Sequence, residues 1–341
     1  MSNIGVGFIG AGDIASIHKT ALLEVPGVRV TAVYDVNETR SKRLASEVGA
    51  ELCKSAEEVA HSRNVDVVYV LTPQPAHFEM VSIALDAGKH TFVEKPVSLR
   101  KQDISEMIQL AEKKRCLCVP GHNYIHSADL KTAKRLLDSG KLGELRALWI
   151  LFMVGLPPEI RNRIPGPLRE VMIHHFYSML FLVGKPEAVF AAVSDFSGRG
   201  EHNEDQAVVI CRMPGGALAT LFASFSAEDL TYDPWTLKYK LIGSAGSASH
   251  GWNSSRLSDR PQPVWDLPAY WETFREEDRY FIEDCLRGGK QPLSTLHDAL
   301  AALDILDAVE SSVRTGSEQA LQREMVNVHD REGSESRTSS G

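Results

Sequence analysis

The sequence predicts two domains of different architecture, an α/β domain with a doubly wound parallel sheet and an α+β domain with an open, mainly antiparallel sheet. The 341 residues exceed the length of one typical domain. Short β-like runs alternate with amphipathic helices in the first third of the chain, whereas longer β-like runs joined by turns follow later. We expect the domains to span 1–120 and 121–324, followed by a disordered tail at 325–341.

The strands of the N-terminal domain are predicted from short, mostly apolar runs, as expected for strands covered on both faces. They are Ile4–Ile9, Val28–Tyr34, Val65–Leu71, His90–Glu94 and Leu117–Val119. The helices between them are predicted from residues typical of helix ends. These residues are Asp13 for the first helix, Asn37 with Gly49, Ser55 with Glu58, Pro75 with Gly88, and Ser98 with Lys114. Strand and helix alternate, which indicates a parallel sheet.

The C-terminal domain is predicted from longer β-like runs that turns connect. The runs are Leu145–Val154, Ala188–Asp195, Gln206–Arg212, Ala217–Phe225 and Thr236–Ile242. Four helices are predicted among and after them, at Leu130–Ser139, Glu170–Val183, Phe274–Arg287 and Leu296–Thr315. Because the strands follow one another without regular crossover helices, we expect mainly antiparallel pairing.

Composition excludes several classes of protein. The net charge is −8 and no basic cluster stands out, which argues against a nucleic-acid partner. No apolar run is long enough to span a bilayer, and no secretory signal is visible at the N-terminus. The five cysteines are odd in number and lie mostly in apolar settings, which favours free thiols in a reducing cytoplasm.

A glycine-rich turn between the first strand and the first helix predicts a dinucleotide site of the Rossmann type. Gly10 permits the tight turn and Gly12 lets a pyrophosphate approach the backbone, while Ala15 occupies the third small position. The backbone N–H groups of Asp13 and Ile14, at the start of the helix, then face the phosphates.

An acidic residue and a second loop extend this site. Asp35 ends the second strand, where its carboxylate can bond the ribose hydroxyls and repel a 2′-phosphate. We therefore expect NAD as the cofactor, with NADP disfavoured. Thr72 and His77 lie on the loop after the strand Val65–Leu71, and we expect this loop to line the nicotinamide side.

The strand His90–Glu94 is followed directly by Lys95 and Pro96. We place Glu94 at the cofactor site. Proline restricts the backbone of Lys95, so its ammonium group leaves the sheet edge in a defined direction and can polarise a hydroxyl or carbonyl.

Together these motifs resemble the Gfo/Idh/MocA family, which includes glucose-fructose oxidoreductase and inositol dehydrogenase. The resemblance rests on the fingerprint with Asp35, the loop from Thr72 to His77, the Glu94-Lys95-Pro96 tripeptide and the β-rich second half, and it runs from Ile4 to about Gly316. It implies hydride transfer between NAD and a secondary alcohol or ketone of a sugar, amino sugar or cyclitol.

The resemblance also implies the catalytic groups. Lys95 matches the family's lysine, and His174 matches its histidine acid/base, with Glu170 one turn earlier at an aspartate position. Tyr177 stands where many members have a second aspartate, and we place it with Glu170 and Asn123 among the substrate contacts. His175 is a rival base that points elsewhere around the helix.

Alternatives of other classes remain at this stage. One is an NAD-dependent hydrolase or lyase that oxidises its substrate transiently, and another is a non-catalytic NAD-binding regulator. We expect no metal site and no membrane partner. Because an open sheet leaves a broad face to bury, and because family members pair these sheets, we expect a homodimer or homotetramer.

Overall fold

The computed structural model describes residues 3–200, 203–226, 236–252 and 268–321. The N-terminal sheet has six parallel strands in the order β3-β2-β1-β4-β5-β6. The strands are β1 (Ile4–Ile9), β2 (Val28–Tyr34), β3 (Glu51–Leu52), β4 (Val67–Val70), β5 (His90–Val93) and β6 (Cys118–Pro120). The helices are α1 (Asp13–Leu23), α2 (Glu38–Val48), α3 (Ala56–His61), α4 (His77–Asp86) and α5 (Lys101–Lys114). This arrangement confirms the predicted doubly wound sheet.

The predicted helix ends account for much of this order. Asn37 caps α2, because its Oδ1 accepts hydrogen bonds from the backbone N–H groups of Thr39 and Arg40. Gly49 ends the helix in a left-handed conformation with φ of 69°. Because the strands are parallel, the loops that follow them lie at one edge of the sheet, where ligands of such folds bind.

The C-terminal sheet has seven strands in the order β12-β11-β7-β10-β9-β8-β13. Its strands are β7 (Leu145–Met153), β8 (Ala188–Ser194), β9 (Gln206–Arg212), β10 (Leu218–Ser224), β11 (Leu237–Gly243), β12 (Ser247–Trp252) and β13 (Gln319–Ala320). Only β7 and β10 pair in parallel among these described strands. The predicted mainly antiparallel sheet is confirmed.

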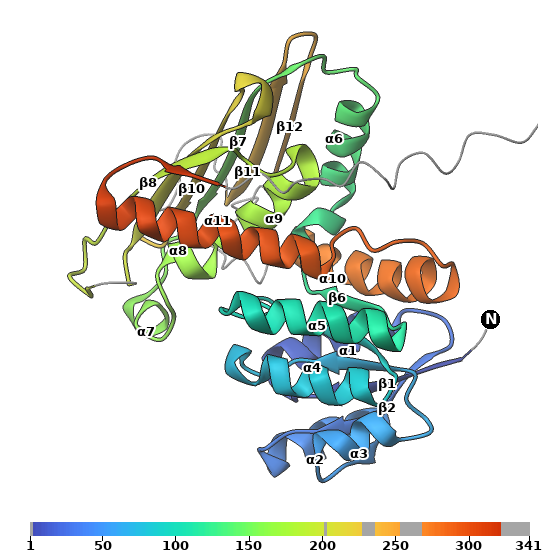
Figure 1. The fold of residues 1–341 in the computed structure, drawn as a ribbon. Coiled ribbons are helices and arrows are strands. Elements are labelled where there is room, and N and C mark those ends of the chain that lie inside the picture. Colours follow the sequence, from blue (N-terminus) through green and yellow to red (C-terminus); the bar gives the residue numbers. More distant parts are fainter. Residues whose placement is uncertain (1–2, 201–202, 227–235, 253–267, 322–341) are drawn as a thin grey trace, which may run out of the picture.

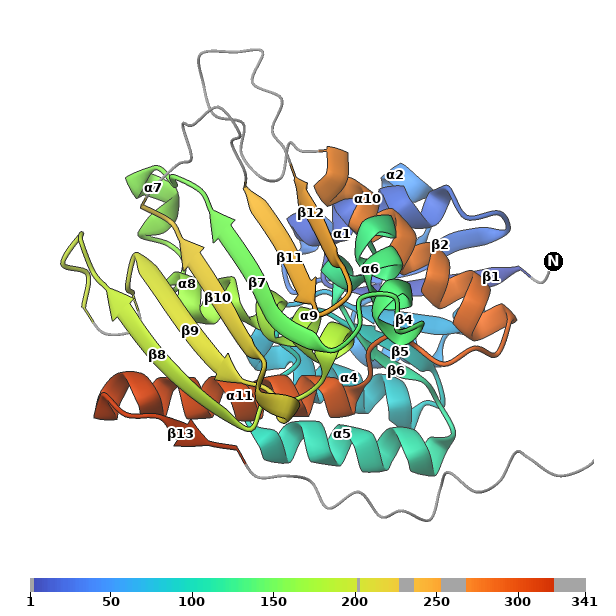
Figure 2. The same cartoon turned by 90° about the horizontal axis from the view of Figure 1, so that it is seen from above.

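Helices α6 (Ala128–Asp138), α8 (Pro167–Glu170), α9 (Met172–Val183) and α11 (Leu296–Thr315) pack on this sheet. The other helices of this half of the chain are η2 (Asn123–His126), α7 (Pro158–Arg161), α10 (Pro268–Arg279) and η5 (Tyr280–Arg287). Figure 1 shows α10 and α11 between the two sheets, where α10 contacts α1 and α11 contacts α5. Figure 2 looks onto the opposite face of the sheet, which no described helix covers.

Two helix predictions need correction, and the sequence does not predict strands β3, β12 and β13. The apolar helix predicted at Glu170–Val183 is two helices, α8 and α9, that meet at Val171. The helix predicted at Phe274–Arg287 begins earlier, at Pro268, and continues as the π-helical η5. Strand β12 is absent from the sequence prediction because its residues, SASHGW, include no run of apolar side chains. The expected tail at 325–341 lies outside the described residues.

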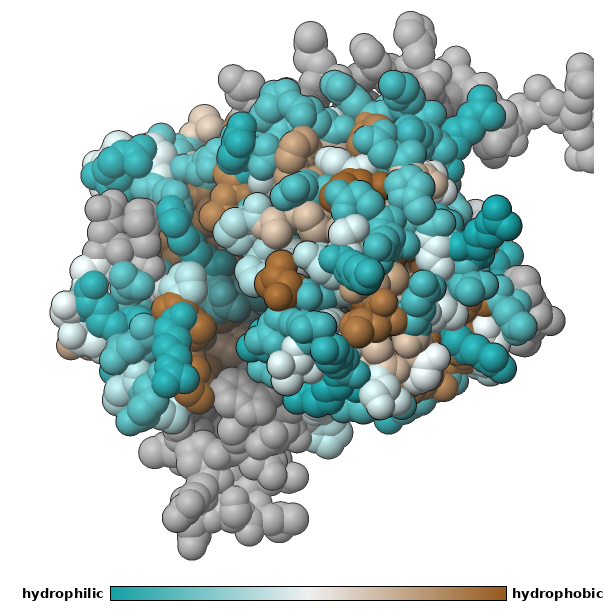
Figure 3. Space-filling view, turned by 90° about the horizontal axis from the view of Figure 1, so that it is seen from below, coloured by the Kyte–Doolittle hydropathy of each residue, from teal (hydrophilic) through white to brown (hydrophobic). Residues whose placement is uncertain are grey.

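Within the described part of the chain, no helix has both the length and the apolar character needed to cross a bilayer. Viewed from the side of the N-terminal sheet, hydrophobic residues form separate patches among hydrophilic ones, and a hollow opens beside one of them (Figure 3).

Candidate active site

The glycine-rich turn between β1 and α1 has the shape that a pyrophosphate requires. Gly10 adopts φ of 107°, and a side chain there would lie 2.6 Å from the backbone of Leu71. A Cβ at Gly12 would meet no atom within 4 Å, so this side of the turn faces open space. Asp13 and Ile14 begin α1 next to that space. The predicted phosphate site is therefore open where the ligand must enter.

Asp35 fastens this turn to the end of β2. Its Oδ2 accepts a hydrogen bond from the Ala11 N–H at 2.6 Å, and its Oδ1 accepts one from the Asn37 N–H at 2.7 Å. A carboxylate has further lone pairs, so the group can still accept from ribose hydroxyls. Thr72, on the loop after β4, has a buried Oγ1 without a hydrogen-bond partner among the described atoms. These features fit a bound dinucleotide.

His77 connects two loops at the same edge. Its Nδ1 lies 3.0 Å from the carbonyl oxygen of Pro96, and its Nε2 lies 2.8 Å from that of Thr72. With both ring nitrogens engaged and the side chain buried, His77 positions the loops rather than presenting a free group to a ligand.

A cavity of about 260 Å³ lies at the junction of the two sheets and brings together residues from both halves of the chain. Its polar lining consists of Glu94, Lys95, Asn123, Glu170 and His174. Its other lining residues are apolar or aromatic: Ile14, Tyr124, Phe152, Val154, Leu156, Ile160, Ile164, Val171, Phe225, Tyr270 and Phe274. The predicted lysine and histidine thus line one cavity.

An ion pair crosses this cavity between the two halves of the chain. Lys95 Nζ lies 3.0 Å from Glu170 Oε1, and both side chains are partly exposed. Glu170 therefore lies beside the lysine in the structure, although the sequence predicts it as the neighbour of His174. The Glu170 carboxylate can hold the Lys95 ammonium group in place, and the remaining ammonium hydrogens are left to bond a ligand.

His174 is the buried base candidate. Its ring stacks on Tyr124 with centroids 4.1 Å apart, and its Nδ1 contacts the Tyr177 hydroxyl. Burial, then the charge of Lys95, holds the pKa of His174 well below its ordinary value of 6.5. His175 points to the sheet instead, because its Nε2 lies 3.0 Å from the Phe222 carbonyl oxygen. Of the two histidines, only His174 lines the described cavity.

Sequence reasoning missed a buried charge cluster behind Lys95. His18, on α1, lies between two carboxylates, with Nε2 3.0 Å from Glu94 and Nδ1 2.9 Å from Asp278. Burial lowers the pKa of His18, but Asp278 and then Glu94 outweigh it and raise the pKa to about 10. Glu94 also accepts a hydrogen bond from the Lys95 N–H at 2.9 Å. Its side chain thus joins His18 to the backbone of the lysine.

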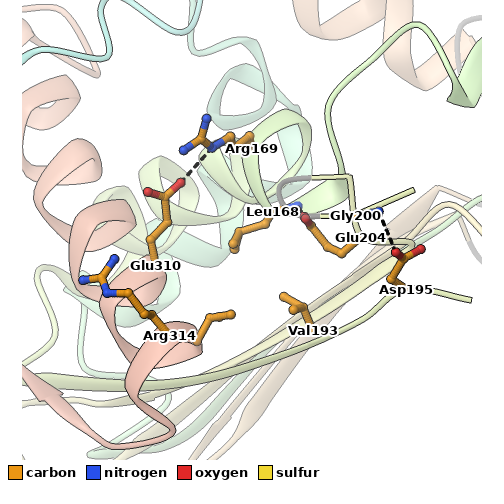
Figure 4. Close-up of a pocket in the computed structure, with 9 residues that line it drawn as sticks. Leu168, Arg169, Val193, Asp195, Gly200, Glu204, Glu310 and Arg314 are labelled. Carbon is orange, nitrogen blue, oxygen red and sulfur yellow. Dashed lines mark hydrogen bonds and ion pairs between the residues drawn. The ribbon is translucent and has the colours of Figure 1, made fainter. Parts of the chain in front are cut away.

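A larger cavity, of about 420 Å³, lies elsewhere, among α8, β8 and α11 (Figure 4). Arg169 and Glu310 point toward each other across it and pair at 2.7 Å. None of the described residues lining it is a predicted site residue. Within the described residues no group of three or more His, Cys, Asp or Glu side chains is arranged to hold a metal ion.

Comparisons with known proteins agree with this architecture. A family description of oxidoreductases with an NAD-binding Rossmann fold matches residues 4–122, and the GFO/IDH/MocA C-terminal domain matches residues 130–249. The chain is similar to myo-inositol 2-dehydrogenase of Thermotoga maritima, with 30% identity covering 90% of this chain and 96% of that protein. It is also similar to dTDP-3,4-didehydro-2,6-dideoxy-alpha-D-glucose 3-reductase of Actinomadura kijaniata, with 28% identity covering 91% of this chain and 96% of that protein.

The fold has close structural neighbours. Scyllo-inositol dehydrogenase of Lactobacillus casei, solved with NAD(H) and scyllo-inositol, superposes with a TM-score of 0.79 at 18% identity, covering 93% of this chain and 99% of that one. The family match, to oxidoreductases with an NAD-binding Rossmann fold, identifies the cofactor as NAD. The chain belongs to the GFO/IDH/MocA family of oxidoreductases with an NAD-binding Rossmann fold.

Proposed function

We propose that the protein transfers a hydride between NAD and a secondary alcohol or ketone of a sugar, amino sugar or cyclitol, with Lys95 and His174 as its catalytic residues. The observation that carries this proposal is that both side chains line one cavity at the junction of the two sheets. Bound NAD⁺ accepts the hydride from the carbinol carbon of the alcohol, and bound NADH donates it to the carbonyl carbon of the ketone. Relatives of named activity are dehydrogenases and reductases, which gives no support to a hydrolase, a lyase or a regulator.

Each polar group then has a distinct task. His174, neutral because burial lowers its pKa, takes the hydroxyl proton of an alcohol and returns it in the reducing direction. The Lys95 ammonium group stabilises the negative charge that develops on the substrate oxygen. Glu170 holds Lys95 and accepts a hydrogen bond from a neighbouring hydroxyl.

The remaining lining suits a ring with one polar edge. Sugar and cyclitol rings expose C–H groups between their hydroxyls, and aliphatic and aromatic walls pack against such surfaces. Phe152, Val154 and Leu156 contribute apolar lining to the cavity, and Lys95 and His174 contribute polar lining. The ring therefore binds with its reacting carbinol toward Lys95 and His174.

The uncovered face of the C-terminal sheet supports a homo-oligomer, as a dimer or tetramer. A row of side chains crosses this face through paired positions on four strands, from Phe190 to Ile210, Thr220 and Trp149. Phe190, Ile210 and Trp149 are 39%, 42% and 40% exposed, and such apolar patches mark interfaces. The free thiols of the five cysteines support a reducing cytoplasm as the location.

The direct test is a substrate panel of inositols, sugars and amino sugars with purified protein and NAD, with NADH formation followed by absorbance. The proposal expects steady NADH accumulation with at least one polyol, and a rate at least about 100-fold lower with His174→Gln. A protein that binds NAD and cleaves a glycoside without net NADH formation would show that the proposal is wrong.

A further inference from the structure

A chain of buried hydrogen bonds runs from the backbone of α10 to the ring of His174. The Thr273 hydroxyl donates to the Tyr270 carbonyl oxygen at 2.6 Å, and the Asn123 Nδ2 donates to Thr273 Oγ1 at 2.8 Å. The Tyr177 hydroxyl lies 3.3 Å from Asn123 Oδ1 and contacts His174 Nδ1. Thr273, Asn123, Tyr177 and His174 are all buried. Water therefore does not compete for these bonds.

The direction of each bond follows from two backbone groups. The Tyr270 carbonyl oxygen can only accept, so the single hydrogen of Thr273 points to it and Oγ1 must accept from Asn123. This turns Asn123 Oδ1 toward Tyr177, where it needs a donor. The Tyr124 N–H already donates to the Tyr177 oxygen at 3.3 Å. The hydrogen of the phenol is therefore the donor that satisfies Asn123.

We propose that this chain fixes His174 in the tautomer with hydrogen on Nδ1 and a bare Nε2, so that Tyr177, Asn123 and Thr273 are positioning residues for the base. Having given its hydrogen to Asn123, the Tyr177 oxygen can only accept from Nδ1. Nε2 makes no hydrogen bond within the described residues, and it is left to receive a substrate proton. Only that last step rests on the proposed function.

The chain orients His174 without adding negative charge. Tyr177, Asn123 and Thr273 are neutral partners, whereas a carboxylate at Nδ1 would favour the imidazolium and raise the pKa of the ring. The ionisable groups that act on His174 are Lys95, His175 and His122, and all three disfavour its charged form. A neutral ring with a defined tautomer is thus available over a wide pH range.

The tautomer can be read directly in the protein without ligand or turnover. Long-range ¹⁵N–¹H correlation spectra of ¹⁵N-histidine protein distinguish a protonated, pyrrole-type nitrogen from a bare, pyridine-type one, and the His174→Gln spectrum assigns the signals. We expect a protonated Nδ1 and a bare Nε2 at neutral pH. A spectrum with the hydrogen on Nε2 overturns the proposal, as does an equal mixture of the two forms.

Variants test the chain at a distance from the cavity. Thr273→Val removes the acceptor for Asn123, whose amide can then turn and donate to Tyr177, sending the phenol hydrogen to Nδ1. We expect the tautomer to shift toward hydrogen on Nε2, with kcat lowered about 10- to 100-fold as for other outer hydrogen-bond partners. Thr273→Ser, which keeps the hydroxyl, should restore both the wild-type tautomer and kcat. A Thr273→Val protein with the wild-type tautomer contradicts the proposal.

Tyr239→Phe is the matched control for Tyr177→Phe. Tyr239 is also buried, and its hydroxyl bonds to Ser178 on α9 at 3.2 Å without touching His174. Each variant loses one buried hydroxyl, but only Tyr177→Phe should alter the ¹⁵N–¹H spectrum of His174. Equal effects of the two variants would contradict the proposed role of Tyr177. If the expected tautomer is found in a protein that oxidises no polyol, the proposed function fails while the tautomer proposal stands. If a protein with hydrogen on Nε2 oxidises a polyol, the tautomer proposal fails while the proposed function stands.

Discussion

Two acidic residues at the carboxyl edge of the N-terminal sheet, Asp35 and Glu94, hold loops of the candidate site in place through their carboxylates. Asp35 directly follows β2, and both of its carboxylate oxygens accept hydrogen bonds from backbone N–H groups, those of Ala11 and Asn37. Glu94 likewise bonds both His18 and the N–H of Lys95. Substitution at such positions will change both ligand affinity and loop order.

Asp35→Asn should weaken NAD binding and reduce the preference for NAD over NADP. Losing a charged hydrogen bond to the ribose costs about 1.5–3 kcal/mol, roughly tenfold or more in affinity, and removes repulsion of a 2′-phosphate. Cofactor titration by tryptophan fluorescence and kcat/KM with both cofactors measure this. Glu47→Gln, an exposed carboxylate on α2 that pairs with Lys19, is the control. Unchanged cofactor preference in Asp35→Asn would contradict the assigned role.

The pH profile of oxidation should have no histidine limb near pH 6.5. A base must be deprotonated to act, and the lowered pKa of His174 keeps it so well below that pH. Asn123→Asp, which places a carboxylate on Tyr177, should raise the pKa of His174 and move the acid limb upward. The profile of kcat/KM in constant-ionic-strength buffers measures both. A wild-type midpoint at or above 6.5 contradicts this expectation.

Some site residues could be found from sequence and others could not. Lys95 and the glycines stand beside strand ends in recognisable motifs, so their place at the sheet edge could be predicted. Thr273 and Asp278 lie on α10, far along the chain from their partners Asn123 and His18. No local pattern marks such pairs, because only the packing of α10 between the sheets brings them together.

At the scale of elements, α10 is the link between the cofactor domain and the base. It contacts α1 and η2, supplies Asp278 to His18, and supplies Thr273 to the chain that reaches His174. The sequence predicts only the second half of α10, from Phe274 onward, whereas the helix in the structure begins at Pro268. Strand β12 escapes prediction for a different reason, its lack of a run of apolar side chains.

Removing the cation between the carboxylates should destabilise this junction. In His18→Gln, Glu94 and Asp278 stay buried without a cation between them. Breaking a buried ion pair in this way lowers the free energy of unfolding by about 3–5 kcal/mol. Because the folded pKa of His18 is about 10, above its ordinary 6.5, its stabilisation is full below pH 6.5 and is lost as pH rises toward 10.

Urea unfolding at several pH values between these limits measures the effect. The free energy of unfolding of the wild type should approach that of His18→Gln as pH rises. His61→Gln, which replaces an exposed histidine, should track the wild type throughout. A difference between wild type and His18→Gln that does not change with pH would contradict a charged His18.

At the scale of the whole molecule, one face of the C-terminal sheet is covered by no helix of the described residues (Figure 2), and we propose that it forms the interface of a homo-oligomer. Ile210→Glu places a charge in the centre of the exposed apolar row, and burying it in an interface costs several kcal/mol. We expect a wild-type oligomer in light scattering after size-exclusion chromatography, and a smaller species for Ile210→Glu. Leu52→Glu, at a similarly exposed site on β3, is the control. A monomeric wild type would contradict the assembly proposal.

The two proposed catalytic residues, Lys95 and His174, come from different domains and line one cavity. The central claim is that they act together on one substrate there. The most direct measurement is kcat/KM for Lys95→Ala, His174→Ala and the double variant, on the best substrate of the panel, with NAD affinity measured in each. Groups acting as a unit are non-additive, so each single variant should lose about 10²–10⁴-fold and the double variant hardly more. Near-wild-type turnover in either folded single variant, or losses that multiply in the double variant, would contradict the account.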